Sequence, residues 1–92
     1  MANLPLIVTS LKNTFVSMTL SKEELAKRVG KNIRKHRQLK QMSLNKFALE
    51  SGMEYSQVSR IERGVINTSL YQIYILSKTL EVPITVFFFE IN

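Results

Sequence analysis

The positions of helix-capping residues constrain the fold of this 92-residue chain more than any other feature. Ser21 is followed three residues later by Glu24, a capping box in which each side chain binds a free backbone N–H group at a helix start. Further residues that commonly begin or end helices recur at short intervals: Ser43, Gly52, Gly64, Ser69 and Pro83. The pattern predicts an all-α fold with five short helices.

Apolar residues follow the helical period between these caps. The first predicted helix runs from residue 22 to about Lys40, and one of its stripes contains Leu25, Val29, Ile33 and His36. Gly30 costs this helix about 1 kcal/mol relative to Ala, so the segment could instead be two helices that meet there. The inward positions of the later helices are Leu44, Phe47 and Ala48; Val58, Ile61 and Glu62; Leu70, Ile73, Leu76 and Leu80; and Ile84, Phe87 and Phe88.

The two ends of the chain do not follow this pattern. We expect an N-terminal arm at residues 1–21, a folded domain at 22–88 and a C-terminal tail at 89–92. The arm contains the strand-like run Leu6 to Thr9, and could pair with another arm, lie across the core or stay loose. The tail is also strand-like.

Positive charge is concentrated in one segment of the chain. The whole sequence has 13 Lys and Arg against 7 Asp and Glu, a net charge of +6. Nine of the basic residues and two of the acidic ones lie between residues 22 and 46. Such a run is often only the solvated face of a helix, but it also suits a polyanionic partner.

Composition excludes several kinds of function. The sequence has no Cys and a single His, so we expect no thiolate chemistry, no metal site and no cofactor. We find no apolar run long enough to span a membrane and no secretion signal, and we therefore expect a cytoplasmic protein. We find no nucleophile beside a base and no phosphate-binding Gly loop either, and we do not expect an enzyme.

A pair of short helices stands out as a possible binding unit. The helix that starts at Ser43 and the helix that ends at Gly64 are joined by a tight turn containing Gly52, a spacing typical of a helix-turn-helix. The outward face of the second helix has hydroxyl, phenol and guanidinium groups, which can bind bases or phosphates, and no aliphatic residue. These residues are Tyr55, Ser56, Ser59, Arg60 and Arg63.

Residues 33–88 resemble the helix-turn-helix domain of the phage repressor and Cro family, often called XRE-like. The most specific part of the resemblance is the run Ser59-Arg60-Ile61-Glu62-Arg63-Gly64. The other residues that carry it are Ile33, Arg34, Arg37, Ser43 to Phe47, Ala48, Val58, Asn67 to Leu70, Leu80, Val82 and Pro83. The resemblance implies a scaffold helix at 44–51 and a recognition helix at 55–63 that lies in the major groove of DNA.

The resemblance also implies roles for particular residues. We expect base contacts from Tyr55, Ser56, Ser59 and Arg60, although Tyr55 could instead pack at the edge of the core. We expect phosphate contacts from Ser43, Lys46, Gln57, Arg63, Asn67, Thr68 and Ser69, although the simplest role of Ser43 and Ser69 is helix capping. Arg37 and Glu62 are expected to form a structural ion pair between the first helix and the recognition helix.

Three residues depart from the family pattern. Leu44 occupies a position where the family commonly has Gln, which puts one phosphate contact in doubt. Glu54 replaces a small polar cap before the recognition helix, and its carboxylate would repel a nearby phosphate. His36 takes an aliphatic position, where we expect a half-buried packing residue.

The predicted function is a sequence-specific DNA-binding transcription regulator, with double-stranded DNA as its partner. Such regulators read two-fold operators as dimers, and we expect Phe87, Phe89 and Ile91 to contact the second subunit. Alternatively, the tail could pack under the N-terminal arm of its own chain. A dimeric repressor or autoregulator is favoured. The alternatives are an antitoxin, a restriction-modification controller, or a protein-interaction module that does not bind DNA.

Overall fold

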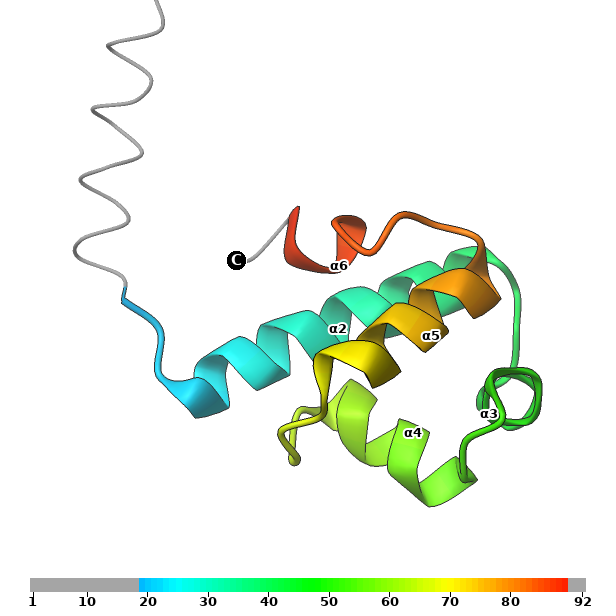
Figure 1. The fold of residues 1–92 in the computed structure, drawn as a ribbon, viewed down its shortest axis with the longest axis horizontal. Helices are drawn as coiled ribbons and strands as arrows, with labels where there is room; N and C mark the ends of the chain where they lie inside the picture. The colour runs from blue at the N-terminus through cyan, green and yellow to red at the C-terminus, as the bar shows by residue number, and fades with distance from the viewer. Residues whose placement is uncertain (1–18, 90–92) are drawn as a thin grey trace, which may run out of the picture.

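The computed structural model describes residues 19–89, and within that range its only regular elements are five α-helices (Figure 1). The helices are α2 (Lys22–Leu39), α3 (Leu44–Ser51), α4 (Tyr55–Arg63), α5 (Leu70–Leu80) and α6 (Val86–Phe89). The predicted all-α fold is therefore confirmed. Most of the predicted N-terminal arm and all but the first residue of the predicted tail lie outside the described residues.

The predicted capping box begins α2. The Glu24 backbone N–H donates to the Ser21 hydroxyl (3.1 Å), and the Ser21 backbone N–H donates to the Glu24 carboxylate (3.2 Å). From there α2 runs without a break through Gly30 to Leu39, so the alternative of two helices meeting at Gly30 is wrong.

The other predicted boundaries are also confirmed, apart from the last. The hydroxyls of Ser43 and Ser69 accept backbone N–H groups at the starts of α3 and α5. Gly52 and Gly64 end α3 and α4 with φ angles of 74° and 70°, a left-handed conformation that only glycine adopts without strain. The final helix is shorter than predicted, because α6 begins at Val86 and Pro83 lies in the turn before it.

The core lies between α2, α4, α5 and α6, and α3 adds Phe47 and Ala48 to it from its contacts with α4 and α5. Its centre consists of side chains without any exposed surface: Ile33, Phe47, Val58, Leu76, Leu80 and Phe87. Figure 1 shows α2 and α5 side by side, with α4 below them and α6 above. The predicted recognition helix, α4, therefore lies on one side of the packed helices α2 and α5.

Three residues predicted to be inward are exposed instead. Leu25 is 42% exposed, Leu70 is 72% exposed and Phe88 is 41% exposed. The periodicity was assigned correctly for the rest of each helix, but these three side chains border a groove that is open to solvent.

Phe87 was predicted to contact a second subunit, and this is wrong. Its side chain is fully buried within the chain, and its ring centroid lies 6.1 Å from that of His36. No surface of Phe87 is left for a partner. Phe89 is 85% exposed, whereas Ile91 lies outside the described residues.

His36 is half-buried, as expected for a packing residue.

Among the helices of residues 19–89, none combines the length and apolar character needed to cross a membrane.

Candidate nucleic-acid interface

The turn between α3 and α4 sets the angle of the predicted recognition helix. At Gly52 the backbone adopts φ 74° and its N–H donates to the carbonyls of Ala48 and Leu49. The N–H of Met53 also donates to the Ala48 carbonyl, at 3.1 Å. Only three residues, 52–54, separate α3 from the start of α4 at Tyr55, so the two helices form a helix-turn-helix.

The inner face of α4 packs very closely on α2. Val58, Ile61 and Glu62 are all buried, with at most 6% of their surface exposed. A Cβ atom on Gly30 would lie 2.3 Å from the Ile61 carbonyl oxygen and 2.6 Å from that of Glu62. Gly30 therefore allows the backbones of α2 and α4 to approach, a function that its helix propensity did not indicate.

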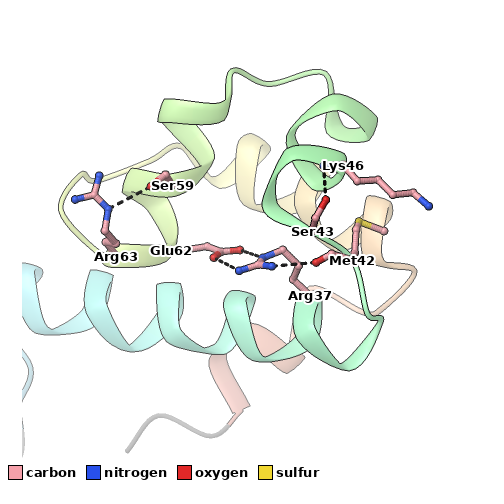
Figure 2. A network of polar contacts seen from close by, with 7 residues as sticks. All are labelled: Arg37, Met42, Ser43, Lys46, Ser59, Glu62 and Arg63. Atoms are coloured by element: carbon pink, nitrogen blue, oxygen red, sulfur yellow. Dashed lines mark hydrogen bonds and ion pairs between the residues drawn. The ribbon is translucent and has the colours of Figure 1, made fainter.

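The predicted ion pair between α2 and α4 is present and buried (Figure 2). Arg37 donates from Nε and Nη2 to the two carboxylate oxygens of Glu62, at 2.7 and 3.0 Å. Its Nη1 atom donates to the Met42 carbonyl oxygen, at 2.9 Å. One guanidinium group thus fixes the recognition helix to α2 and to the turn before α3.

The outer face of α4 is polar and open to solvent. Tyr55 is 53% exposed, and Ser56, Arg60 and Arg63 are exposed as well, while Ser59 is half-buried. The Ser59 hydroxyl accepts a hydrogen bond from Arg63 Nε, at 3.3 Å (Figure 2). The structure therefore brings all five predicted residues to one face. The exposure of Tyr55 favours the base-contact role over a packing role.

The predicted phosphate contacts at the start of α3 surround a helix N-terminus. The Ser43 hydroxyl accepts the Lys46 backbone N–H, at 3.0 Å, so Ser43 does act as a cap. The Lys46 side chain extends from the same turn (Figure 2). Its ammonium lies 3.6 Å from the carboxylate of Glu50. Gln57 is half-buried on the flank of α4. An exposed N-terminus with a nearby ammonium is suited to a phosphate oxygen.

The second predicted phosphate site lies after the recognition helix. Ser69 caps α5 by accepting the Gln72 backbone N–H, at 3.1 Å, and is exposed. Thr68 is half-buried, and its hydroxyl donates to the Gln72 side-chain oxygen. Asn67 is exposed. Of the three, Asn67 and Ser69 are more accessible than Thr68, whose hydroxyl is bound to Gln72 of the same chain.

Two departures from the family pattern have a structural consequence. Leu44 packs against the hydrophobic core, so the position offers no polar group. Glu54 is the N-terminal cap of α4, but its side chain makes no capping hydrogen bond. The first turn of the recognition helix is therefore not capped by a side chain, and it begins beside a carboxylate.

One supporting residue was missed by the sequence reasoning. The Asn32 side chain is buried and donates from Nδ2 to the Phe87 carbonyl oxygen, at 2.8 Å. This bond ties α6 to the middle of α2. A polar residue on a helix that is otherwise strongly charged gave no signal of burial, because its acceptor lies 55 residues away in the sequence.

Comparison with known proteins agrees with this geometry. Residues 33–87 match the helix-turn-helix family, and the chain belongs to the XRE-type branch of helix-turn-helix proteins. It is 44% identical over 61 residues to the HTH-type transcriptional regulator SlrR of Bacillus subtilis (strain 168). That match covers 65% of this chain and 40% of SlrR, so the chain spans less than half the length of this relative.

Solved structures show the same fold. The restriction-modification controller protein C.AhdI from Aeromonas hydrophila is 33% identical, with a TM-score of 0.64, over 68% of this chain and 94% of C.AhdI. The clp gene regulator ClgR from C. glutamicum has a TM-score of 0.70 over 73% of this chain and 87% of ClgR. At 22% identity, the likeness to ClgR supports the fold alone.

Proposed function

We propose that this protein is a sequence-specific DNA-binding transcription regulator that reads an operator with α4 in the major groove. One observation carries the proposal. The outer face of α4 presents Tyr55, Ser56 and Arg60 to solvent, while its inner face is fixed by a buried ion pair. A rigid helix with exposed hydroxyl and guanidinium groups is suited to hydrogen bonding with base edges.

The helix N-termini on either side of α4 support the same proposal. Ser43 and Lys46 at the start of α3, and Asn67 and Ser69 before α5, would bind phosphates of the backbone and set the register of α4. Gln57, Arg63 and Thr68 are the remaining proposed phosphate contacts. Ser59 remains a proposed base contact, and its hydroxyl also accepts a hydrogen bond from Arg63, a proposed phosphate contact.

The experiment that tests this proposal begins with selection of bound duplexes from a random library. The selected duplex and a scrambled duplex are then titrated with protein at two salt concentrations. We expect binding of the selected duplex to be about 1,000-fold tighter or more, and to weaken as salt rises. Equal and weak binding of both duplexes would contradict sequence-specific recognition.

Substitutions at Arg60 separate base recognition from simple charge attraction. Arg60→Ala should cost about 1–3 kcal/mol on the selected duplex, because a bidentate contact to guanine is lost. Arg60→Lys keeps the charge, and should retain binding to the scramble while losing much of the discrimination. Lys78→Ala removes an exposed charge from α5 and serves as the control. If Lys78→Ala and Arg60→Ala had equal effects, α4 would not be the reading element.

We further propose that the regulator is a homodimer whose contact includes the C-terminal helix. Phe89 is 85% exposed at the end of α6, and Ile91 follows it in the sequence. Tyr71 and Tyr74, also exposed, lie with their rings 6.2 Å apart on α5. Exposed apolar residues in this number commonly mark an interface.

Sedimentation of the purified protein tests the dimer. Phe89→Ser should shift the molecule toward the monomer, and binding of a two-fold duplex should weaken with it. Leu49→Ser is a matched control, because Leu49 is 81% exposed on α3, outside the proposed contact. An unchanged mass for Phe89→Ser, or an equal change in both variants, would remove Phe89 from the interface.

The likeness to C.AhdI supports a more specific role. We propose that the protein acts as a repressor or autoregulator, and a restriction-modification controller is the form that this likeness favours. A gene for a restriction enzyme beside its own gene, and binding to the DNA between them, would support that role. Binding only to distant promoters would contradict it.

A further inference from the structure

An open apolar groove lies between the N-terminal half of α2 and the helices α5 and α6. It has a volume of about 200 Å³ and is bordered by Leu25, Val29, Leu70, Ile73 and Phe88. Three of these side chains, Leu25, Leu70 and Phe88, keep 41–72% of their surface exposed. Asn67 and Thr68, two of the proposed phosphate contacts, also border the groove. Its exposed apolar side chains, Leu25, Leu70 and Phe88, are not among the proposed DNA contacts, so DNA recognition as proposed does not account for them.

The sequence before α2 has a stripe of matching chemistry. Leu4, Val8, Leu11, Phe15 and Met18 are separated by alternating steps of four and three residues. This spacing places five apolar side chains on one face of a helix, with Asn13 on the opposite face. The strand-like run Leu6 to Thr9 is contained within this longer helical pattern.

The point of attachment brings the stripe to the groove. The residues that the structure describes begin at Thr19, and α2 starts at Lys22, one turn before Leu25. A connection of three residues is sufficient to reverse the chain between two antiparallel helices. Phe15 and Met18, at the end of the stripe, would then meet the part of the groove nearest to Leu25.

We propose that residues 4–18 dock their apolar stripe into the groove of the same chain as a helix antiparallel to α2. Because the segment is covalently attached to α2, its effective concentration at this groove is high. The same segment of a second copy could compete only at a protein concentration above that value. The docked segment would cover Leu25, Leu70 and Phe88 and leave the outer face of α4 free. The proposal is tested without DNA, so its outcome is independent of the outcome for the DNA-binding function.

A single tryptophan can report docking, because the chain contains no Trp. In the variant Phe15→Trp, emission should be shifted to the blue relative to Asn13→Trp, whose probe would face solvent. Adding Leu70→Glu to Phe15→Trp should shift the emission to the red. Leu70 is 72% exposed, so this change places a charge in the groove without disturbing the core. Far-UV circular dichroism verifies that each variant is folded.

Subunit mixing separates docking on the same chain from an exchange between chains. Phe15→Trp protein is mixed and re-equilibrated with an excess of the tryptophan-free Leu70→Glu protein. Blue emission that persists after mixing supports docking within one chain. A red shift on mixing would show that the segment occupies the groove of a second copy, and would overturn the proposal. Equal emission from Phe15→Trp and Asn13→Trp would overturn it as well.

Discussion

The two faces of α4 differ in their contacts with the rest of the chain. On the inner face, Val58, Ile61 and Glu62 are buried against α2, and the Arg37 guanidinium binds both oxygens of Glu62. On the outer face, Tyr55 and Arg60 are exposed to solvent. The inner face therefore determines where α4 lies, while the outer face is free to determine what α4 binds.

This difference separates two ways of losing function. A change on the inner face alters the position or stability of α4, so all DNA binding should fall together. A change on the outer face removes one contact and leaves the free energy of unfolding almost unchanged, as is usual for exposed positions.

Glu62→Ala should produce the largest effect. It leaves the Arg37 guanidinium buried without its partner, which should lower the free energy of unfolding by about 3–5 kcal/mol. That is a large part of the total stability of a small domain. Urea unfolding followed by circular dichroism measures the change, and a loss below about 1 kcal/mol would contradict it.

The double variant Arg37→Met with Glu62→Leu provides the control for this prediction. It removes both charges and keeps apolar volume between α2 and α4, so much of the stability should return. If the double variant were as unstable as Glu62→Ala, packing rather than the stranded charge would explain the loss.

Gly30→Ala tests the close contact between the two helices. In an isolated helix this substitution stabilises by about 1 kcal/mol, but here the new Cβ would lie 2.3 Å from the Ile61 carbonyl oxygen. We expect α4 to be pushed away from α2, with a loss of about 1–3 kcal/mol in the free energy of unfolding.

A comparison of Lys31→Ala with Lys31→Gly, at an exposed position one residue further along α2, measures the propensity difference between Ala and Gly by itself. DNA affinity should fall for Gly30→Ala more than for Lys31→Ala. An increase in the melting temperature of Gly30→Ala would show that the inner face tolerates displacement of α4.

The parts of the fold that were predicted from the sequence are those fixed by local contacts. Ser21, Ser43 and Ser69 bind N–H groups three residues away, so the sequence around each cap contains the whole interaction. The ion pair of Arg37 with Glu62 is a long-range contact, and it was predicted from the family resemblance rather than from spacing.

Long-range packing without a family signal was not predicted. The role of Gly30 depends on carbonyl groups of α4, and the role of Asn32 depends on a carbonyl of α6. Phe87 was expected both in the core and at a dimer contact, and only its burial in the structure decides between them. The outer face of α4 was grouped correctly because helical period alone places those residues together.

Glu54→Ser acts at the boundary between the two faces. Glu54 caps α4 without a side-chain hydrogen bond, whereas a serine hydroxyl could accept an N–H of the first turn. We expect the free energy of unfolding to rise by up to about 1 kcal/mol. We also expect tighter DNA binding at low salt, because a carboxylate near the phosphates is removed.

Glu54→Gln distinguishes these two effects. It removes the charge without supplying a good cap, so DNA affinity should rise while stability does not. If neither variant changed affinity, Glu54 would lie far from the phosphates, and α4 would approach DNA in a different orientation from the one proposed.

The smallest effect is expected for an ion pair outside the inner face. Lys40 donates to Glu81 at 3.0 Å, close to the distance in the Arg37 pair, but the Glu81 side chain is 79% exposed. Water and salt screen such a pair, so Lys40→Met should lower the melting temperature only slightly. A loss comparable to that of Glu62→Ala would show that burial does not distinguish the two pairs.

The pH dependence of this last effect has a definite sign. The hydrogen bond and charge of Lys40 lower the pKa of Glu81 below its ordinary value of 4.5. Because the folded pKa is the lower one, the contribution of the pair is present above pH 4.5 and is lost as the pH falls through the folded value. The difference in melting temperature between the wild-type protein and Lys40→Met should therefore be measurable at pH 7 and vanish in acid, with 1 M salt at pH 7 reducing it too. A difference that persists in acid would assign the effect to packing of the Lys40 side chain, since the carboxylate would then be protonated.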